Sequence, residues 1–153
     1  MTVAEVMCRR VQVMDASTPC VTAWEFMRRT GTEHVAVVSH SGRVHGVVSV
    51  QDVAVAWCER GEPPFRETLG ELLLGRLRPR ILEDAPVGLA ARIMLDSGFT
   101  ALPVLSSRRA LVGIVSERDV LAAVAGGRPQ MRALVGRAER PAHAAAETAG
   151  LAS

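Results

Sequence analysis

The sequence predicts a mixed α/β (α+β) protein made of two tandem βαββα units packed about a pseudo-two-fold axis. Two observations support this fold class: one set of residues recurs at a fixed spacing, and each copy carries the same order of helix and strand signals. The pairs that lie 67 positions apart are Gly46 and Gly113, Ser49 and Ser116, Asp52 and Asp119, Pro19 and Pro86, Met27 and Met94, and Gly31 and Gly98. One unit of about 60 residues buries too little surface alone, so we expect two units packed face to face.

Local signals set the helices of each unit. A Thr-x-x-Glu capping box opens both units, at Thr2 and at Thr68, and predicts a short leading helix. The prolines at 19 and 86 suit the first position of the next helix, with Thr18 as the cap of the first one. The glycines at 31 and 98 are expected C-terminal stops.

The remaining elements follow in the same order in both units. The first unit is expected to have strands at 11–14, 34–39 and 43–48 and a last helix at 50–59, and the second has strands at 80–82, 101–105 and 110–115 and a last helix at 117–125. Residues 1–60 then form the first repeat, 61–66 a linker with paired prolines, and 67–126 the second repeat. Residues 127–153 form an Ala/Arg-rich tail, expected to be loosely helical or disordered.

Composition excludes several classes of function. A net charge of +2 and 3% aromatic residues argue against a nucleic-acid partner. The chain has no apolar run of the roughly 20 residues that a membrane helix needs and no signal-peptide pattern, so we expect a cytoplasmic protein. The absence of lysine excludes a Schiff-base or P-loop lysine. Local spacing suggests no catalytic triad, and we therefore expect a protein that is not an enzyme.

The three cysteines are Cys8, Cys20 and Cys58. An odd count without a Cys-x-x-Cys pair argues against a disulfide framework or a zinc knuckle. The simplest expectation is three small buried hydrophobic side chains, and redox sensing is the alternative.

The turn Gly-x-x-Ser-x-x-Asp, present in both units, is the candidate binding element. Glycine lets another group approach the backbone, and serine stands at a helix N-cap where free N–H groups favour an anion. The aspartate can accept two hydrogen bonds from a vicinal diol such as that of ribose. Ser-x-x-Asp is also close to an ordinary capping box, which needs no ligand.

The βαββα duplication, the TVAEVM opening, the Ala-Leu-Pro-Val strand at 101–104 and this turn together resemble a tandem pair of CBS domains, a Bateman module. The resemblance covers about residues 2–125. It implies that Asp52 and Asp119 bind ribose and that Ser49 and Ser116 contact phosphate, beside Gly46 and Gly113. It also implies an adenine pocket formed by backbone near the first and second strands. The positions implied are Val13, Met14, Val35 and Ala36 in the first repeat and Ile81, Leu82, Leu102 and Pro103 in the second.

The two implied sites differ. Gln51 replaces Arg118, which removes a cation suited to phosphate, and the first repeat lacks the proline. The second site is therefore expected to bind more tightly, while His34 is a candidate phosphate contact at the mouth of the first.

The first hairpin holds three histidines, at positions 34, 40 and 45. A tight turn at Gly42 would place His34 opposite His45. Histidines bind zinc, but we expect ordinary polar positions and no metal site.

The resemblance implies a regulatory ligand sensor, with AMP, ADP, ATP or S-adenosylmethionine as candidate ligands and no required cofactor. The alternative is a protein–protein interaction or redox-responsive module of the same fold with degenerate pockets. The last helices are apolar on nearly all sides, and we expect a homodimer. We expect no fused effector domain, and we therefore expect the output to pass to an unknown effector protein.

Overall fold

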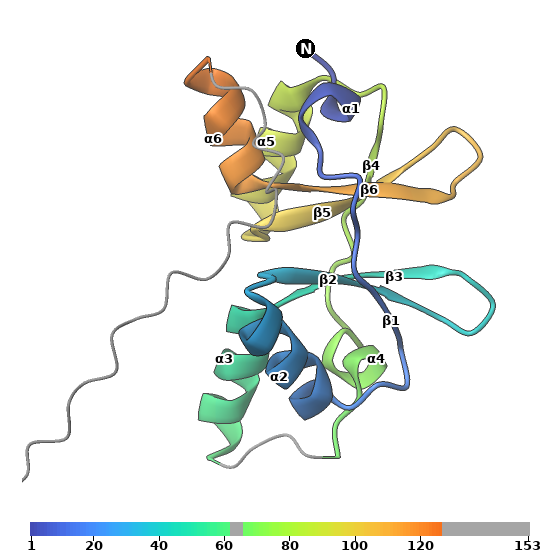
Figure 1. Cartoon of the computed structure of the whole chain (residues 1–153), viewed down its shortest axis with the longest axis vertical. Helices are drawn as coiled ribbons and strands as arrows, with labels where there is room; N and C mark the ends of the chain where they lie inside the picture. The colour runs from blue at the N-terminus through green and yellow to red at the C-terminus, as the bar shows by residue number, and fades with distance from the viewer. Residues whose placement is uncertain (62–65, 127–153) are drawn as a thin grey trace, which may run out of the picture.

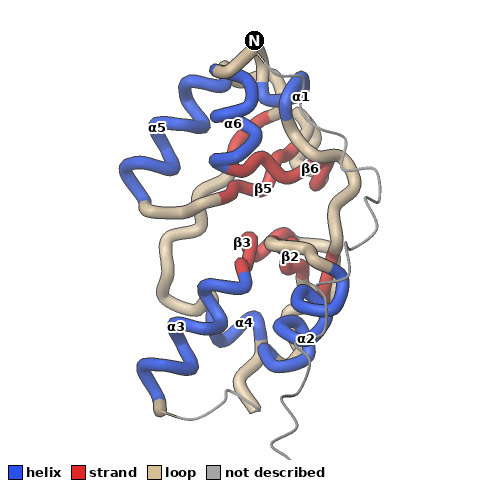
Figure 2. The backbone as a smooth tube through the Cα atoms, turned by 60° about the vertical axis from the view of Figure 1, so that its left-hand side comes forward, coloured by secondary structure: helices blue, strands red, loops and turns tan. Residues whose placement is uncertain are grey.

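The computed structural model describes residues 1–61 and 66–126 and has two similar halves stacked with their sheets facing each other (Figure 1). The expected tail and most of the expected linker lie outside the described residues. Helices cover the outer face of each sheet, so the molecule has the layer order helix, sheet, sheet, helix (Figure 2). The expected α+β fold class is confirmed.

The elements alternate as expected. The first half contains β1 (Val13–Asp15), α2 (Cys20–Thr30), β2 (His34–Val38), β3 (Val44–Ser49) and α3 (Val50–Arg60). The second half contains β4 (Ile81–Leu82), α5 (Val87–Ser97), β5 (Ala101–Leu105), β6 (Leu111–Ser116) and α6 (Glu117–Val124). Two four-residue helices, α1 (Val3–Val6) and α4 (Leu69–Leu72), precede them.

Each half has a three-stranded sheet with the same pairing. The first strand runs parallel to the second, and the second pairs antiparallel with the third, in the orders β1-β2-β3 and β4-β5-β6. The parallel crossover is made by α2 in one half and α5 in the other. The last strand runs directly into α3 or α6, which places both Ser-x-x-Asp turns at the same edge of their sheets.

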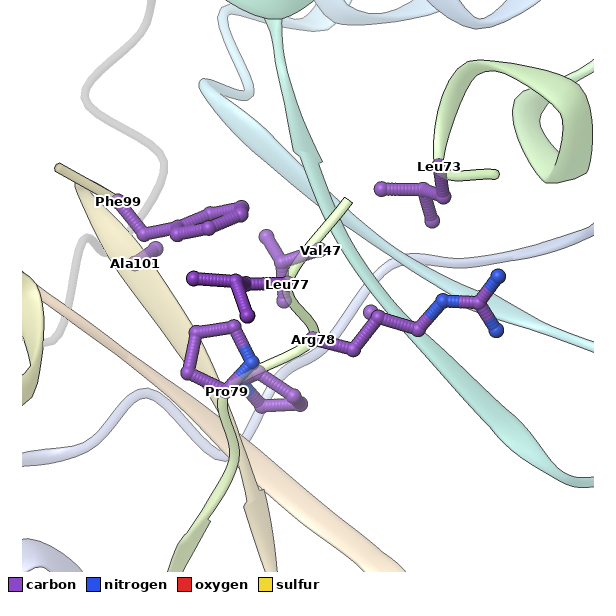
Figure 3. A pocket seen from close by; sticks show the side chains of 9 residues that line it. Val47, Leu73, Leu77, Arg78, Pro79, Phe99 and Ala101 are labelled. Atoms are coloured by element: carbon purple, nitrogen blue, oxygen red, sulfur yellow. The ribbon is translucent and has the colours of Figure 1, made fainter. Parts of the chain in front are cut away.

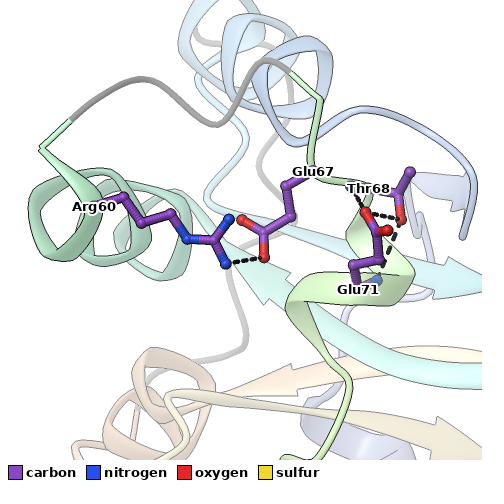
Figure 4. Close-up of polar contacts among 4 residues, drawn as sticks. All are labelled: Arg60, Glu67, Thr68 and Glu71. Carbon is purple, nitrogen blue, oxygen red and sulfur yellow. Dashed lines mark hydrogen bonds and ion pairs between the residues drawn. The ribbon is translucent and has the colours of Figure 1, made fainter.

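The helix ends follow local chemistry with one correction. Both Thr-x-x-Glu capping boxes are present, the second with Thr68 and Glu71 (Figure 4). Gly31 and Gly98 end α2 and α5 with left-handed backbones, at φ +70° and +73°. The prolines at 19 and 86 stand at the N-cap position, one residue earlier than expected, so Thr18 is not the cap.

The leading helices are exchanged between the halves. Val3 and Val6 of α1 lie in the core of the second half, while Leu69 and Leu72 of α4 lie in the core of the first. The backbone follows the same route: the Val3 N–H donates to the Ala85 carbonyl at 2.8 Å. A sequence repeat fixes which helix leads which unit, but the apolar side chains of such a short helix can be buried against either core.

The two sheets meet through small side chains. Ala36 and Val47 of the first half form one buried cluster with Ala101 and Ile114 of the second. Ala36 of β2 and Ala101 of β5 let the sheets approach closely, and Val47 of β3 and Ala101 also line the candidate site.

An ion pair between the half-exposed Arg60 and the nearly buried Glu67 side chain holds the chain before α4. The Arg60 guanidinium donates to Glu67 Oε1 at 2.7 Å (Figure 4), and the Glu67 side chain is only 8% exposed. The Cys20 backbone N–H donates to the Glu67 carbonyl at 2.7 Å. Burial, with the nearby charge of Glu67, raises the pKa of the Cys20 thiol to about 11, so this thiol stays protonated at neutral pH.

Candidate ligand-binding site

The turn between β3 and α3 forms a complete capping box. The Ser49 backbone N–H and hydroxyl both donate to Asp52 Oδ2, at 2.8 Å each, and the Asp52 N–H donates to Ser49 Oγ at 3.1 Å. One carboxylate oxygen of Asp52 is thus used by the helix end. The other, Oδ1, lies 3.5 Å from Arg76 Nη1.

The turn between β6 and α6 repeats this geometry. The Ser116 N–H and hydroxyl donate to Asp119 Oδ2 at 2.7 Å each, and the Asp119 N–H donates to Ser116 Oγ at 3.3 Å. Arg118 is exposed on the first turn of α6. The capping role considered from the sequence is therefore real in both repeats, and any ligand would bind to residues that already hold a helix end.

A cavity of about 210 Å³ lies beside the first of these turns. Residues from both halves and from the segment before β4 line it. They are His34, Val47, Ser49, Gln51, Asp52, Val55, Arg76, Gly98, Phe99, Thr100 and Ala101. A molecule bound here would contact both repeats at once.

His34 links the two halves at this cavity. Its Nε2 lies 3.1 Å from the hydroxyl oxygen of Thr100, within hydrogen-bond distance. Burial lowers the pKa of His34 below its usual value of 6.5. Carboxylates of both repeats act in the opposite direction, namely Glu33, Asp52, Asp119 and Glu117. His34 is therefore neutral at pH 7 and lies within the electrostatic reach of both Ser-x-x-Asp turns.

A smaller hollow of about 10 Å³ adjoins the cavity (Figure 3). Leu77 and Pro79 from the segment before β4 approach Phe99 there, and Pro103 of β5 also lines it. A volume near 10 Å³ holds about one water molecule, so these side chains pack closely. On the other side of this segment, Arg78 Nη1 lies 3.4 Å from His45 Nδ1.

Both motif glycines face the protein's own chain, which leaves no room for a Cβ at Gly113 but ordinary contact distance at Gly46. A Cβ on Gly113 would lie 2.5 Å from Met7 Sδ and 3.0 Å from the Cys8 carbonyl oxygen. At Gly46 the nearest atom is a Leu73 side-chain carbon at 3.4 Å. Met7 and Leu73 follow the exchanged helices α1 and α4, so the close approach that the sequence predicted is made by these helices' C-terminal ends.

Most of the residues expected around an adenine are closed to solvent. The buried ones are Val35, Ala36, Ile81, Leu102 and Pro103. Leu82 and Val13 are exposed, and Met14 is half-buried. A base can therefore reach the buried positions only if neighbouring side chains move.

The strand pairing corrects the alignment of these positions between repeats. Met14 pairs with Val37, and Ile81 pairs with Val104, so Met14 and Ile81 are equivalent. The positions expected around an adenine, Val13 and Met14 in one repeat and Ile81 and Leu82 in the other, are therefore shifted by one residue relative to each other. Hydrogen-bond register fixes this equivalence, and short apolar strands carry too little pattern to do so.

The expected pairing of His34 with His45 is wrong. His34 pairs with Ser49, and His45 lies at an irregularity of the hairpin between Gly46 and Val44. The loop is longer than a two-residue turn: the Ser39 N–H donates to the Arg43 carbonyl at 2.8 Å. Among the described residues no group of three His, Cys, Asp or Glu side chains is placed to hold a metal.

The cysteines differ from the expectation in part. Cys20 is buried as expected, but Cys8 and Cys58 are exposed. Cys8 lies on the chain that crosses from α1 to β1, and Cys58 lies near the end of α3, where the outer face meets solvent.

Sequence reasoning missed two polar residues of the cavity, Arg76 and Thr100. Neither belongs to the repeated motif. Arg76 comes from the segment before β4, and Thr100 comes from the residues just before β5. The arginines at 76, 78 and 80 before β4 were a visible signal, but only the fold shows that the first of them points to Asp52.

The comparisons with known proteins identify the family. A model of the CBS domain matches residues 3–58 and 79–126. The chain belongs to the CBS domain family. This confirms the expected tandem pair, whose two copies correspond to the two sheets and their helices.

Individual CBS relatives are distant. An uncharacterized protein of Methanopyrus kandleri, MK0525, is 27% identical over 106 residues, which cover 67% of this chain and 54% of that protein. The chain thus spans about half the length of this relative. The CBS domain pair of protein MJ0100, solved with 5′-methylthioadenosine and S-adenosyl-L-methionine, matches with a TM-score of 0.69 at 20% identity over 82% of this chain and 97% of that one. CBSX2, solved with AMP, matches with a TM-score of 0.65 at 24% identity over 82% and 96%.

CBS domain pairs are generally regulatory modules and not catalytic ones. The structural likeness shows that the fold is shared, and the ligands named above belong to those two proteins. Within residues 1–61 and 66–126, no helix is long and apolar enough to cross a membrane.

Proposed function

We propose that this CBS protein is a regulatory sensor that binds an adenosine nucleotide or S-adenosylmethionine between its two repeats and needs no cofactor. The observation that carries the proposal is the cavity of about 210 Å³ that joins Ser49 and Asp52 of one repeat to Thr100 of the other. A ligand that touches both repeats stabilises one arrangement of them, which an effector protein can read. The ligands of MJ0100 and CBSX2 support the ligand class. A cytoplasmic location remains a prediction.

In this proposal the residues of the turns have separate roles. Asp52 and Asp119 accept hydrogen bonds from a ribose diol, each through the carboxylate oxygen that the cap does not use. Ser49 and Ser116 offer the helix N-terminus to a phosphate, and Arg118 adds a cation at the second turn. The remaining candidates border the base or the mouth of the cleft: His34, Val35, Ala36, Gly46, Ile81, Leu82, Leu102, Pro103 and Gly113.

Thermal unfolding with and without ligand tests the proposal. A ligand that binds only the folded chain at about 100 times its dissociation constant adds roughly 2.7 kcal/mol to the free energy of unfolding. We expect at least one of AMP, ADP, ATP and S-adenosylmethionine, at millimolar concentration, to raise the melting temperature. Native mass spectrometry of freshly purified protein would show a bound ligand directly. Unchanged melting with all four compounds would reject adenosyl-ligand sensing.

A second candidate is an interaction or redox-responsive module with degenerate pockets. Two observations favour it: both Ser-x-x-Asp turns are complete without a ligand, and Cys8 and Cys58 are exposed thiols. This candidate predicts that nucleotides leave the melting temperature unchanged. It also predicts that oxidation changes the melting temperature of the wild type but not that of a Cys8→Ser, Cys58→Ser variant.

We also propose a homodimer, because large apolar side chains are exposed on the outer helices. Leu95 of α5 is 82% exposed, and Leu121 and Val124 of α6 are 67% and 81% exposed. The helices α5 and α6 contact each other, and exposed apolar side chains that gather on neighbouring helices are typical of an interface. Light scattering should give a dimer mass for the wild type and a monomer mass for Leu121→Glu. A wild-type monomer at micromolar concentration would contradict this proposal.

A further inference from the structure

The first site has a cation that does not come from its own motif. Arg76 lies between α4 and β4, and its Nη1 is 3.5 Å from Asp52 Oδ1. Both side chains are partly open to solvent, at 35% and 30% exposed. Within the described part of the chain, Arg76 is the one arginine that lines the cavity of about 210 Å³. The first repeat therefore recovers the positive charge that it lacks at Gln51.

The other groups around the cavity cannot bind an anion without Arg76. The N-terminus of α3 carries partial positive charge, yet Asp52 stands on it with a full negative charge. His34 is neutral at pH 7, because burial lowers its pKa. Without the guanidinium of Arg76, a phosphate in this cavity would meet the Asp52 carboxylate with no full positive charge to balance it.

We propose that Arg76 binds the 5′-phosphate of a nucleotide in the first site, so that this site selects 5′-phosphorylated adenosines over uncharged ones such as adenosine or 5′-methylthioadenosine. This inference rests on the proposed function. In the ligand-free chain Arg76 pairs with Asp52, the expected ribose acceptor. Ligand binding exchanges partners: the ribose diol donates to the Asp52 carboxylate, and the guanidinium donates to the phosphate.

The geometry makes this exchange feasible. An ion pair of 3.5 Å that is about one-third exposed contributes little to stability, so its loss opposes binding only weakly. Guanidinium–phosphate hydrogen bonds are charge-assisted and often bidentate, and they replace it with a stronger contact. The cavity, at about 210 Å³, is smaller than most ligand pockets, which measure roughly 300–1,000 Å³. Movement of the Arg76 side chain away from Asp52 would enlarge it.

Calorimetric titration with AMP and with adenosine tests the proposal, in chains carrying Asp119→Ala so that the second site contributes little. The test variant is Arg76→Gln, and the matched control is Arg92→Gln, which removes the same charge from an exposed position on α5. We expect Arg76→Gln to weaken AMP binding by about 10- to 150-fold, as for a lost hydrogen bond to a charged group, with adenosine affinity almost unchanged. Arg92→Gln should change neither. Melting curves of all variants verify folding.

Each other outcome overturns either this inference or the proposed function. Equal losses for AMP and adenosine, or no loss for either, would overturn the phosphate role of Arg76. Equal gains for both would show that Arg76 only blocks Asp52. If the parent chain binds neither compound, the adenosyl-ligand proposal fails at this site, and pyrophosphate then tests the anion site alone. Stabilisation of the parent chain by pyrophosphate that Arg76→Gln abolishes would retain the anion site, and no stabilisation would overturn it.

Discussion

The turns at Ser49–Asp52 and Ser116–Asp119 share one internal geometry but have different neighbours. Their capping hydrogen bonds agree within 0.2 Å. Outside the turn, Asp52 meets Arg76 from the segment before β4, whereas the second turn carries its own Arg118, which is exposed. The residues that recur in both repeats therefore form the same N-terminal cap twice. Residues outside the repeated motif, such as Arg76, give the two caps different neighbours.

We place the specificity of the proposed sites in this difference. A capping box needs only a serine and an aspartate at the right spacing, and both repeats have them. The charge and shape of the cavity beside the first cap come from residues outside the repeated motif. Examples are Arg76, in the chain before β4, and the Phe99–Thr100 pair. We infer that the two sites, if both bind, select ligands differently.

The largest expected effect separates ligand binding from capping. Asp119→Ala should weaken binding at the second site by about 10- to 150-fold if its carboxylate binds ribose. The second site is expected to bind more tightly, so Asp52→Ala should reduce the affinity of the tighter binding step less than Asp119→Ala does. Calorimetric titration of both variants measures this. Asp119→Asn is the control for folding, because its amide oxygen can still accept the Ser116 hydrogen bonds. Equal affinity losses at the two positions would contradict the predicted asymmetry.

The next largest effect is on stability and comes from adding a Cβ at a glycine that the chain covers. Gly113→Ala should lower the free energy of unfolding by about 1–3 kcal/mol, because its Cβ would meet Met7 and the rigid Cys8 carbonyl. Gly88→Ala, on α5 with open space around it, should instead raise this free energy by about 0.5–1 kcal/mol. Urea unfolding of both variants gives the comparison. A Gly113→Ala protein as stable as wild type would show that the α1 segment does not pack there in solution.

A smaller effect tests whether the two caps are equal. Ser49→Ala and Ser116→Ala should each lower the free energy of unfolding by about 1 kcal/mol, because each removes the same side-chain cap. Ser107→Ala, at an exposed turn, should leave it nearly unchanged. Chemical denaturation of the three variants decides this, and clearly unequal losses at the two caps would break the equivalence of the turns.

The smallest effect is a pH dependence that only the first repeat carries, because Ala101 stands where the first repeat has His34. The folded-state pKa of His34 lies below its unfolded value of 6.5, so the unfolded chain takes up the proton first as the pH falls. His34 therefore leaves stability complete above pH 6.5 and lowers it progressively below that value. The free energy of unfolding at pH 7.5 and 5.5 should differ less in His34→Gln than in wild type. An identical pH dependence in both proteins would rule out this role.

Local features were predictable, and features that depend on distant contacts were not. The capping boxes at Thr2 and Thr68 and the ends at Gly31 and Gly98 were correct, because each depends on residues within one or two turns of a helix. The cross-strand partner of His34 was wrong, because loop length and an irregularity set the register. Cys8 and Cys58 were expected to be buried, and composition alone cannot tell which face of an element a thiol occupies.

The sequence by itself determined that the chain has two similar units and that the last helix of each unit begins with Ser-x-x-Asp. It also determined the resemblance to the CBS domain family. Those properties depend on the spacing of residues along the chain, and this spacing can be read by comparing the two copies of the repeat. The tertiary structure alone decided that α1 and α4 exchange cores and that Arg76 and Thr100 line the cavity beside Asp52. These residues are far from Asp52 in sequence or outside its repeat. They meet because the exchanged helices and the packing of Ala36 and Val47 against Ala101 and Ile114 hold the two halves together.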